Sequence, residues 1–365
     1  MDEKIKKTLS YSIKEGSSTA VMSGAGESYI VPYALALNAS NAQIGFLSSF
    51  VGLFGTASQI FGSKLVYTYK KKKIVVLGVF LQATMWLFIL GLGLLSLFNL
   101  INGTAASILI FLYTLYAIAG NVSGPAWFAW MGDLVPEKKR GDYFSRRNRI
   151  IGIISMSVTF LSALFLDYTK EIGLLMWGFI ILFGIASIAR YISSYLLTKH
   201  YDFGNKSERE SYFSFFRFLK KAPYNNFGKF VFYIGLINFA TSFAGPFFAV
   251  YMLNELHFSY LTFTLVNISA GVFTFLTISF WGRIGDNYGN RQLLRICALL
   301  IAITPILWIF SSNPWYLIFI AQMVSGIGWA GFNLGASNFI YDAVTPQRRA
   351  ICVAYYTMIA GIGVF

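Results

Sequence analysis

The chain has 365 residues, of which 56% are hydrophobic and 12% are charged, and its formal net charge is +14. This balance is far more apolar than that of a soluble globular domain, so it predicts a membrane protein. The two cysteines, Cys297 and Cys352, lie inside apolar runs, and His200 and His257 are far apart. These residues exclude a disulfide-stabilised secreted domain and argue against a zinc enzyme, so we expect no metal and no cofactor.

Apolar runs long enough to cross a bilayer recur along the whole chain. A transmembrane helix needs about 20 predominantly apolar residues. Ten complete spans are predicted, at residues 17–39, 41–67, 74–98, 105–133, 144–168, 172–197, 228–253, 259–284, 291–311 and 314–343. An eleventh run begins near Ala350 and is cut off at Phe365, so we expect the sequence to be a fragment of a longer protein.

The basic residues gather on one side of the predicted membrane. They fall in alternate connections, at 4–14, 70–73, 138–149, 190–229, 283–295 and 348–349, and of the 29 lysines and arginines only Lys170 lies opposite. The positive-inside rule then places the N-terminus in the cytoplasm and predicts a multi-pass protein of the cytoplasmic (plasma) membrane. Because the charge is explained by topology, we expect membrane lipids and no nucleic acid as partners.

The longest connection divides the chain into domains. Residues 198–227 contain the aromatic and basic stretch 212–221, which predicts an amphipathic helix in the cytoplasmic membrane interface. The predicted domains are an N-terminal six-helix bundle at 1–197, this cytoplasmic linker at 198–227, and an incomplete C-terminal bundle at 228–365.

Landmark residues recur in the same order in the two halves. The matched pairs are Ser28 with Ser242 and Pro32 with Pro246, 214 residues apart; Gly62 with Gly282, 220 apart; and Asp133 with Asp342 and Arg140 with Arg349, 209 apart. Both halves begin on the same side of the membrane. We therefore predict parallel repeats related by an axis along the membrane normal.

A glycine-rich motif connects the eighth and ninth spans. The stretch 282–291 fits G-x-x-x-D-x-x-G-x-R through Gly282, Asp286, Gly289 and Arg291. In this motif, its topology and its repeat, the chain resembles the major facilitator superfamily. The resemblance implies a conformational latch at the cytoplasmic side, in which Asp286 accepts hydrogen bonds from a neighbouring helix N-terminus. The alternative is an ordinary cytoplasmic turn, and the first half departs from the pattern because Val66 replaces the aspartate.

Two acidic-x6-arginine elements follow the fourth and tenth spans. They are Asp133 with Arg140 and Asp342 with Arg349, and similar elements occur in superfamily members that include sugar porters. A carboxylate that pairs with arginine in one conformation and not in another would make a two-state cytoplasmic gate. A static pair beside a turn is the alternative.

Glu27 lies near the middle of the first predicted span, where an ionisable group is costly and is a functional candidate by default. We interpret it as a residue for substrate contact or for carrying a coupling proton, so protons are a candidate partner. The alternative is a protonated or hydrogen-bonded glutamate that holds helices together. The repeat puts Thr241 at the equivalent position.

The resemblance also implies that the first, fourth, seventh and tenth helices line a cavity. Besides Glu27, the candidate substrate residues on these spans are Tyr29, Asn121, Trp127, Asn238, Thr241, Asn333 and Asn338. Amide and aromatic groups suit a neutral or amphiphilic solute. No basic residue lies deep in these four predicted spans, so a strongly anionic substrate would lack a counter-charge.

The fold expected is an all-α polytopic membrane protein of two six-helix bundles, truncated here within the eleventh helix. The function expected is secondary active transport of a small-molecule substrate by alternating access, with proton coupling as a hypothesis. No phosphate-binding loop is present, and no nucleophile with a base indicates an enzyme. The alternatives are a lipid flippase or scramblase on the same scaffold, and a membrane sensor that transports nothing.

Overall fold

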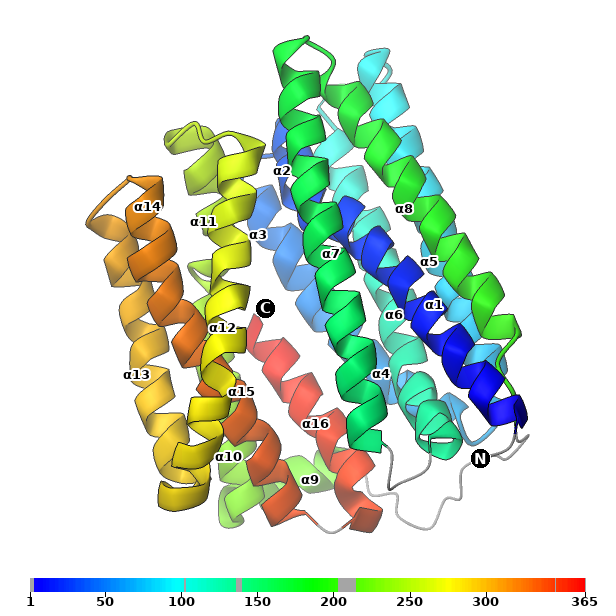
Figure 1. Cartoon of the computed structure of the whole chain (residues 1–365), viewed down its shortest axis with the longest axis vertical. Helices are drawn as coiled ribbons and strands as arrows, with labels where there is room; N and C mark the ends of the chain where they lie inside the picture. Colours follow the sequence, from blue (N-terminus) through cyan, green and yellow to red (C-terminus); the bar gives the residue numbers. More distant parts are fainter. Residues whose placement is uncertain (1–2, 102, 136–139, 203–214, 345, 365) are drawn as a thin grey trace. The chain divides into compact units, whose positions relative to one another are not determined.

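The computed structural model describes residues 3–101, 103–135, 140–202, 215–344 and 346–364 (Figure 1). These residues are almost entirely helical, and no strand occurs among them. The chain divides into two compact units, Met1–Arg209 and Glu210–Val364. The division falls inside the predicted linker, and each unit is described by itself.

The first unit contains six rods of helix. They are α1 (Glu3–Ala25) continued by η1 (Glu27–Tyr29) and α2 (Ile30–Ala36); α3 (Asn41–Phe50) continued by η2 (Val51–Gly55) and α4 (Thr56–Leu65); α5 (Lys71–Leu97); α6 (Ala105–Leu134); α7 (Arg140–Glu171); and α8 (Leu175–Thr198). The helix α5 packs along α6 and α8, while α1 packs along α7 and α8 (Figure 1). Each rod coincides with one of the six spans predicted for this half.

The second unit repeats this order with more interruptions. Its elements are α9 (Phe215–Lys221), η4 (Ala222–Tyr224), α10 (Asn226–Ser242), α11 (Gly245–Val250), η5 (Tyr251–Glu255), α12 (Tyr260–Tyr288), α13 (Asn290–Ile309), α14 (Pro314–Tyr316), η6 (Leu317–Ala321), α15 (Gln322–Ala343) and α16 (Pro346–Val364). The helix α15 packs along α12 and α13, and α10 packs along α16. The first rod of each unit is interrupted at a similar place, after Ala25 in one and after Ser242 in the other.

The first helix corrects one detail of the predicted spans. It begins at Glu3 rather than near residue 17. Its polar residues Thr8, Ser12 and Glu15 are buried inside the first unit, where they pack against neighbouring helices instead of water. Within the described residues, nine helical segments are long and apolar enough to cross a membrane, and this polar first helix is not among them.

Glycines form one turn and two close helix contacts in the second unit. Gly289, with φ of 81°, forms the turn between α12 and α13, as expected for the glycine-rich motif. In α15, a Cβ on Gly326 would lie 2.4 Å from the Ala270 carbonyl oxygen, and one on Gly331 would lie 2.4 Å from the Cys297 sulfur. These glycines therefore allow α15 to lie close to α12 and α13.

Candidate functional site

Glu27 lies in η1, at the interruption of the first helix. Its side chain is half-buried and accepts two hydrogen bonds from hydroxyl groups. The Ser23 hydroxyl donates to Oε2 at 2.6 Å, and the Tyr116 phenol of α6 donates to Oε1 at 2.5 Å. Each oxygen of the Glu27 carboxylate therefore has a hydroxyl donor.

Aromatic rings fix the Tyr116 phenol. Tyr116 is 3% exposed, its ring stacks on Tyr113 at 5.3 Å, and Trp86 of α5 meets it edge to face, also at 5.3 Å. Gly26 is required for this packing, because a Cβ there would lie 2.6 Å from the Trp86 ring. The interruption of the helix at Gly26 thus places Glu27 beside the packed rings of Trp86, Tyr116 and Tyr113.

A second carboxylate on the same helix, Glu15, forms a buried ion pair with Arg147 of α7. The Arg147 guanidinium lies 3.0 Å from Glu15 Oε2, and the two residues are 7% and 4% exposed. Arg147 also donates to the Ser12 carbonyl oxygen at 3.3 Å, and its guanidinium lies 5.0 Å from the Trp127 ring centroid. A paired, hydrogen-bonded guanidinium is the form in which a buried arginine is tolerated.

Arg190 of α8 is linked to Glu15 through a hydroxyl group and to the backbone of Tyr116 through Gln82. It donates to the Thr19 hydroxyl at 2.8 Å, and that hydroxyl donates to Glu15 Oε1 at 2.9 Å. Its other nitrogens donate to Gln82 Oε1. The Gln82 amide in turn donates to the main-chain carbonyl oxygen of Tyr116 at 3.3 Å, whereas the bond to Glu27 comes from the phenol at the other end of that residue.

Sequence analysis missed three members of this network. Glu15 precedes the first predicted span, Arg147 is one of several basic residues assigned to a cytoplasmic connection, and Arg190 was counted with the following connection. Glu15 is more deeply buried in the first unit than Glu27. A heptad-like spacing of the small polar residues Ser12, Thr19 and Ser23 along α1 was the available signal.

The other predicted substrate residues are dispersed. Tyr29 is fully buried and donates to the Thr159 carbonyl oxygen at 2.5 Å, while Trp127 packs on Arg147. Asn121 accepts a hydrogen bond from Gln59 at 2.7 Å. The remaining four lie in the second unit: Asn238 and Thr241 bond to carbonyl oxygens of their own helix, Asn333 is exposed, and Asn338 is half-buried. Their role in substrate binding stays a prediction.

The predicted gate residues make equivalent contacts in the two units. In the first unit, Asp133 at the end of α6 pairs with Lys71, the first residue of α5, at 2.6 Å. In the second unit, Asp342 accepts a hydrogen bond at 2.8 Å from Asn290, the first residue of α13. The side chains of Arg140 and Arg349 lie outside the described residues, so pairing with them stays a prediction. Gly282 is half-buried in α12, and Asp286 and Arg291 are exposed on either side of the Gly289 turn.

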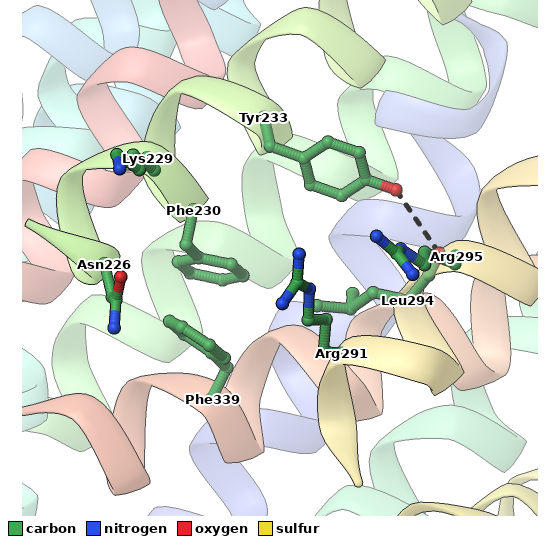
Figure 2. A pocket seen from close by; sticks show the side chains of 8 residues that line it. All are labelled: Asn226, Lys229, Phe230, Tyr233, Arg291, Leu294, Arg295 and Phe339. Atoms are coloured by element: carbon green, nitrogen blue, oxygen red, sulfur yellow. Dashed lines mark hydrogen bonds between the residues drawn. The ribbon is translucent and has the colours of Figure 1, made fainter. Parts of the chain in front are cut away.

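A cavity of about 490 Å³ lies in the second unit, beside the first turns of α10 and α13. Figure 2 shows the ring of Phe230 stacked on that of Phe339, with Lys229, Arg291 and Arg295 around them. In the first unit, α8 covers the corresponding faces of α1 and α5. In the described part of the second unit no helix covers α10 and α13 in this way, so the cavity marks an uncovered helix face.

Comparison with known proteins identifies relatives over different shares of the chain. Residues 17–238 and 230–365 match the Major Facilitator Superfamily. The hexose transporter HXT10 of Saccharomyces cerevisiae is 34% identical over 84 residues, which are 23% of this chain and 15% of that protein. Hexose transporter 2 of Kluyveromyces lactis is 30% identical over 83 residues, 23% of this chain and 15% of that protein. These alignments thus span a small part of the curated relatives' length.

Solved structures match over nearly the whole chain. The nucleoside transporter NupG superposes with a TM-score of 0.62 at 15% identity, covering 98% of this chain and 88% of that one. A bacterial homologue of the iron transporter ferroportin, in its inward-facing state, superposes with a TM-score of 0.68 at 15% identity, covering 100% and 93%. At this identity the likeness establishes the fold.

Proposed function

Because the chain belongs to the Major Facilitator Superfamily and is a multi-pass membrane transporter, we propose that it moves a small polar solute by alternating access, driven by protons that bind at Glu27. The observation that carries the proposal is the Glu27 carboxylate, held inside the first unit by Tyr116 and Ser23. We further propose that the N-terminus lies in the cytoplasm, in the plasma membrane, as the basic residues indicate.

Glu27 suits a coupling role because of its place on the helix and its partners. It lies where the first helix is interrupted, and no lysine or arginine contacts its carboxyl group directly among the described residues. A carboxyl held by hydroxyl groups can gain or lose a proton without breaking an ion pair. An acid that changes charge inside the membrane can couple proton movement to a conformational change.

The proposed substrate is a neutral solute with several hydroxyl groups. The two curated relatives are named hexose transporters, and one structural neighbour is named a nucleoside transporter. The amides of Asn121, Asn238 and Asn338 could donate to and accept from such hydroxyl groups.

The equivalent contacts at the helix ends suit alternating access. Asp133 with Lys71 and Asp342 with Asn290 each join the fourth rod of a unit to the start of its third rod. Each contact ties two helices within one unit, so each unit can move as a body. In this proposal the Gly282–Arg291 motif forms the cytoplasmic latch through Asp286, and Arg140 and Arg349 complete the gate.

The test is solute uptake in proteoliposomes that contain the full-length protein. Radiolabelled D-glucose and uridine would be offered with and without an inward proton gradient. We expect Glu27→Gln to abolish gradient-driven accumulation and to retain exchange of solute down its own gradient. Glu171→Gln, at the exposed end of α7, is the matched control and should behave as the wild type.

Accumulation by Glu27→Gln with the rate and pH dependence of the wild type would refute proton coupling. Redistribution of labelled lipid with no transport of either solute would refute the substrate class and favour a lipid flippase or scramblase.

A further inference from the structure

The short helix α9 is attached to the second unit by one of its faces. Phe218 is 5% exposed, and Ala222, one turn further along the chain, is fully buried. The centroid of the Phe218 ring lies 5.4 Å from that of Tyr355 in α16 and 6.0 Å from that of Phe227 in α10. Gly228 packs so closely on the Ala222 backbone that a Cβ there would overlap it. The buried face of α9 is therefore fixed on α10 and α16 (Figure 1).

Asn225 fixes the connection between α9 and α10. Its side-chain nitrogen donates to the Lys221 carbonyl oxygen at 2.7 Å, and its side-chain oxygen accepts from the Gly228 backbone N–H, also at 2.7 Å. One side chain thus satisfies a carbonyl group at the end of α9 and caps the first turn of α10. The helix α9 and the start of α10 therefore form one structural piece.

The opposite face of α9 and η4 combines exposed aromatic rings with exposed cations. Phe216 is 80% exposed and Tyr224 is 88% exposed. The exposed basic residues beside them are Arg217, Lys220, Lys221 and Lys229. We call these six residues the α9 surface. No aspartate or glutamate occurs in residues 215–229, and none of the four cations forms an ion pair with an acid among the described residues.

The α9 surface lies at the border of a membrane span. The segment Asn226–Glu255, which begins with α10, is long and apolar enough to cross a bilayer. Because α9 and η4 directly precede this span, they lie at the level of the lipid headgroups. At that level, lysine and arginine extend their charges toward headgroups and aromatic rings enter the interface. A lipid surface therefore suits both kinds of side chain on this face.

We propose that the α9 surface binds anionic phospholipid headgroups and thereby attaches the second unit to the cytoplasmic leaflet. Charge complementarity selects this partner, because four cations without a neighbouring acid attract anionic headgroups more strongly than zwitterionic ones. Since α9 is fixed on α10 and α16, lipid bound here acts on the second unit itself and not on a loose connection. The inference goes beyond the proposed transport and uses from it only the cytoplasmic placement of this side of the protein.

The test identifies the lipid that lies next to the α9 surface. Full-length protein with Tyr224→Cys carries a bimane fluorophore on the introduced cysteine, and Cys297 and Cys352 are buried. The vesicles contain phosphatidylcholine with one fifth phosphatidylglycerol, and either lipid in turn carries a nitroxide group that quenches bimane. The reference label is at Ile309→Cys, which is 81% exposed at the other end of α13, because no lysine or arginine occurs in residues 296–347.

We expect phosphatidylglycerol to be preferred at the Tyr224→Cys label by at least about fivefold, the factor for one basic side chain at an anionic surface, and no preference at the reference label. Lys220→Gln with Lys221→Gln should reduce the preference to about twofold or less, whereas Lys220→Arg with Lys221→Arg should retain it. The charge-matched control is Lys70→Gln with Lys73→Gln, which removes two exposed lysines of the first unit and should retain the wild-type preference.

An equal preference at the two labels would overturn the inference, and so would a preference that Lys220→Gln with Lys221→Gln leaves intact. Quenching by neither lipid at the Tyr224→Cys label would also overturn it, because protein or water would then cover the surface. If the double variant does not fold, as judged by circular dichroism, the salt dependence of the wild type tests the same charges. A preference that high salt leaves unchanged would then refute the inference. The measurement involves no solute, so the transport proposal can fail in the uptake assay while this inference stands.

Discussion

The two units share one fold but differ in what their equivalent positions contain. Glu15 and Arg147 form a buried ion pair in the first unit. The positions 214 and 209 residues further on hold Lys229 and Tyr356, and the Tyr356 ring stacks on Phe230 with centroids 5.9 Å apart. The same helix arrangement therefore forms with an aromatic contact in that place. The ion pair is therefore a feature of the first unit that these positions of the second unit do not repeat.

Glu27, the acid of the proposed proton coupling, likewise has no acidic counterpart at the equivalent position of the second unit. Glu27 corresponds to Thr241, whose hydroxyl donates back to the Ile237 carbonyl oxygen at 3.0 Å. A threonine side chain carries no carboxyl group that could bind and release a proton. In the proposed mechanism, proton chemistry would therefore belong to the first unit, and the second unit would contribute neutral contacts to the solute.

The largest effect is expected from breaking the ion pair on one side only. Arg147→Met leaves the Glu15 carboxylate buried with its principal counter-charge removed and should destabilise the protein by about 3–5 kcal/mol. Thermal unfolding in detergent measures this loss. The double variant Glu15→Leu with Arg147→Met should recover most of the loss, because a buried pair can be replaced by apolar groups.

Lys229→Met is the comparison in the second unit, and we expect a change within about 0.5 kcal/mol because Lys229 is exposed. If Arg147→Met unfolds at the temperature of the wild type, the pair does not hold the first unit together.

The next largest difference is expected between Gly62 and Gly282, the equivalent glycines of the second rod in each unit, when each is replaced by alanine. A Cβ on Gly62 would lie 2.3 Å from the Val122 carbonyl oxygen, which is fixed in the backbone of α6. Gly62→Ala should therefore force α4 and α6 apart and cost about 1–3 kcal/mol in the free energy of unfolding.

Gly282, its counterpart, has as its nearest neighbour a Leu334 methyl group at 4.0 Å. Gly282→Ala should be neutral or stabilise α12 by up to about 1 kcal/mol, because alanine favours helix over glycine. Equal losses in the two variants, measured by thermal unfolding, would contradict this difference in packing.

The fold could be predicted from the sequence because each membrane span is recognisable from its own residues. Apolar runs fix the helices, and the charge of the connections fixes their alternation, without any knowledge of tertiary contacts. The motif at 282–291 and the repeat then pointed to the family that the comparisons identify.

The site could be predicted only where a residue stands out from its own segment. Glu27 is a charged residue within an apolar run, so it could be predicted as a functional candidate. Glu15 lies in a polar segment, and Arg147 lies beside Arg146 and Arg149, so its burial depends on which face of α7 turns toward α1. Such a rotation is set by tertiary packing, which no local pattern reports. For the same reason the partners of Asp133 and Asp342, Lys71 and Asn290, were not predicted.

A smaller effect, which depends on pH, is expected from His200. His200 is 1% exposed, and burial lowers its pKa below the usual 6.5 even though a backbone hydrogen bond to Leu196 and the charge of Glu15 act the other way. The unfolded chain then binds the proton first as the pH falls. Stability contributed by neutral His200 is present above about pH 6.5 and is lost as the pH falls below that value.

Thermal unfolding at neutral and acidic pH measures this dependence. We expect His200→Asn to reduce the loss of stability on acidification, whereas His257→Asn should leave it unchanged because His257 is exposed. The His257 substitution is a fair control, since asparagine tolerates the positive φ of 51° at that position. A wild-type slope in His200→Asn would assign the acid sensitivity to other groups.

The smallest effect is expected at the equivalent contacts between the third and fourth rods. Lys71 and Asp133 form an ion pair in which the Asp133 side chain is 44% exposed, so water and salt screen it and Lys71→Gln should cost about 0.5–1 kcal/mol. Asn290 carries no charge, so the loss in Asn290→Ala should depend less on salt. A double-mutant cycle of Lys71→Gln with Asp133→Asn, measured by thermal unfolding at low and high salt, isolates the pair. A coupling energy that high salt leaves unchanged would show that the Lys71 contact, like that of Asn290, acts as a hydrogen bond and not as an ion pair.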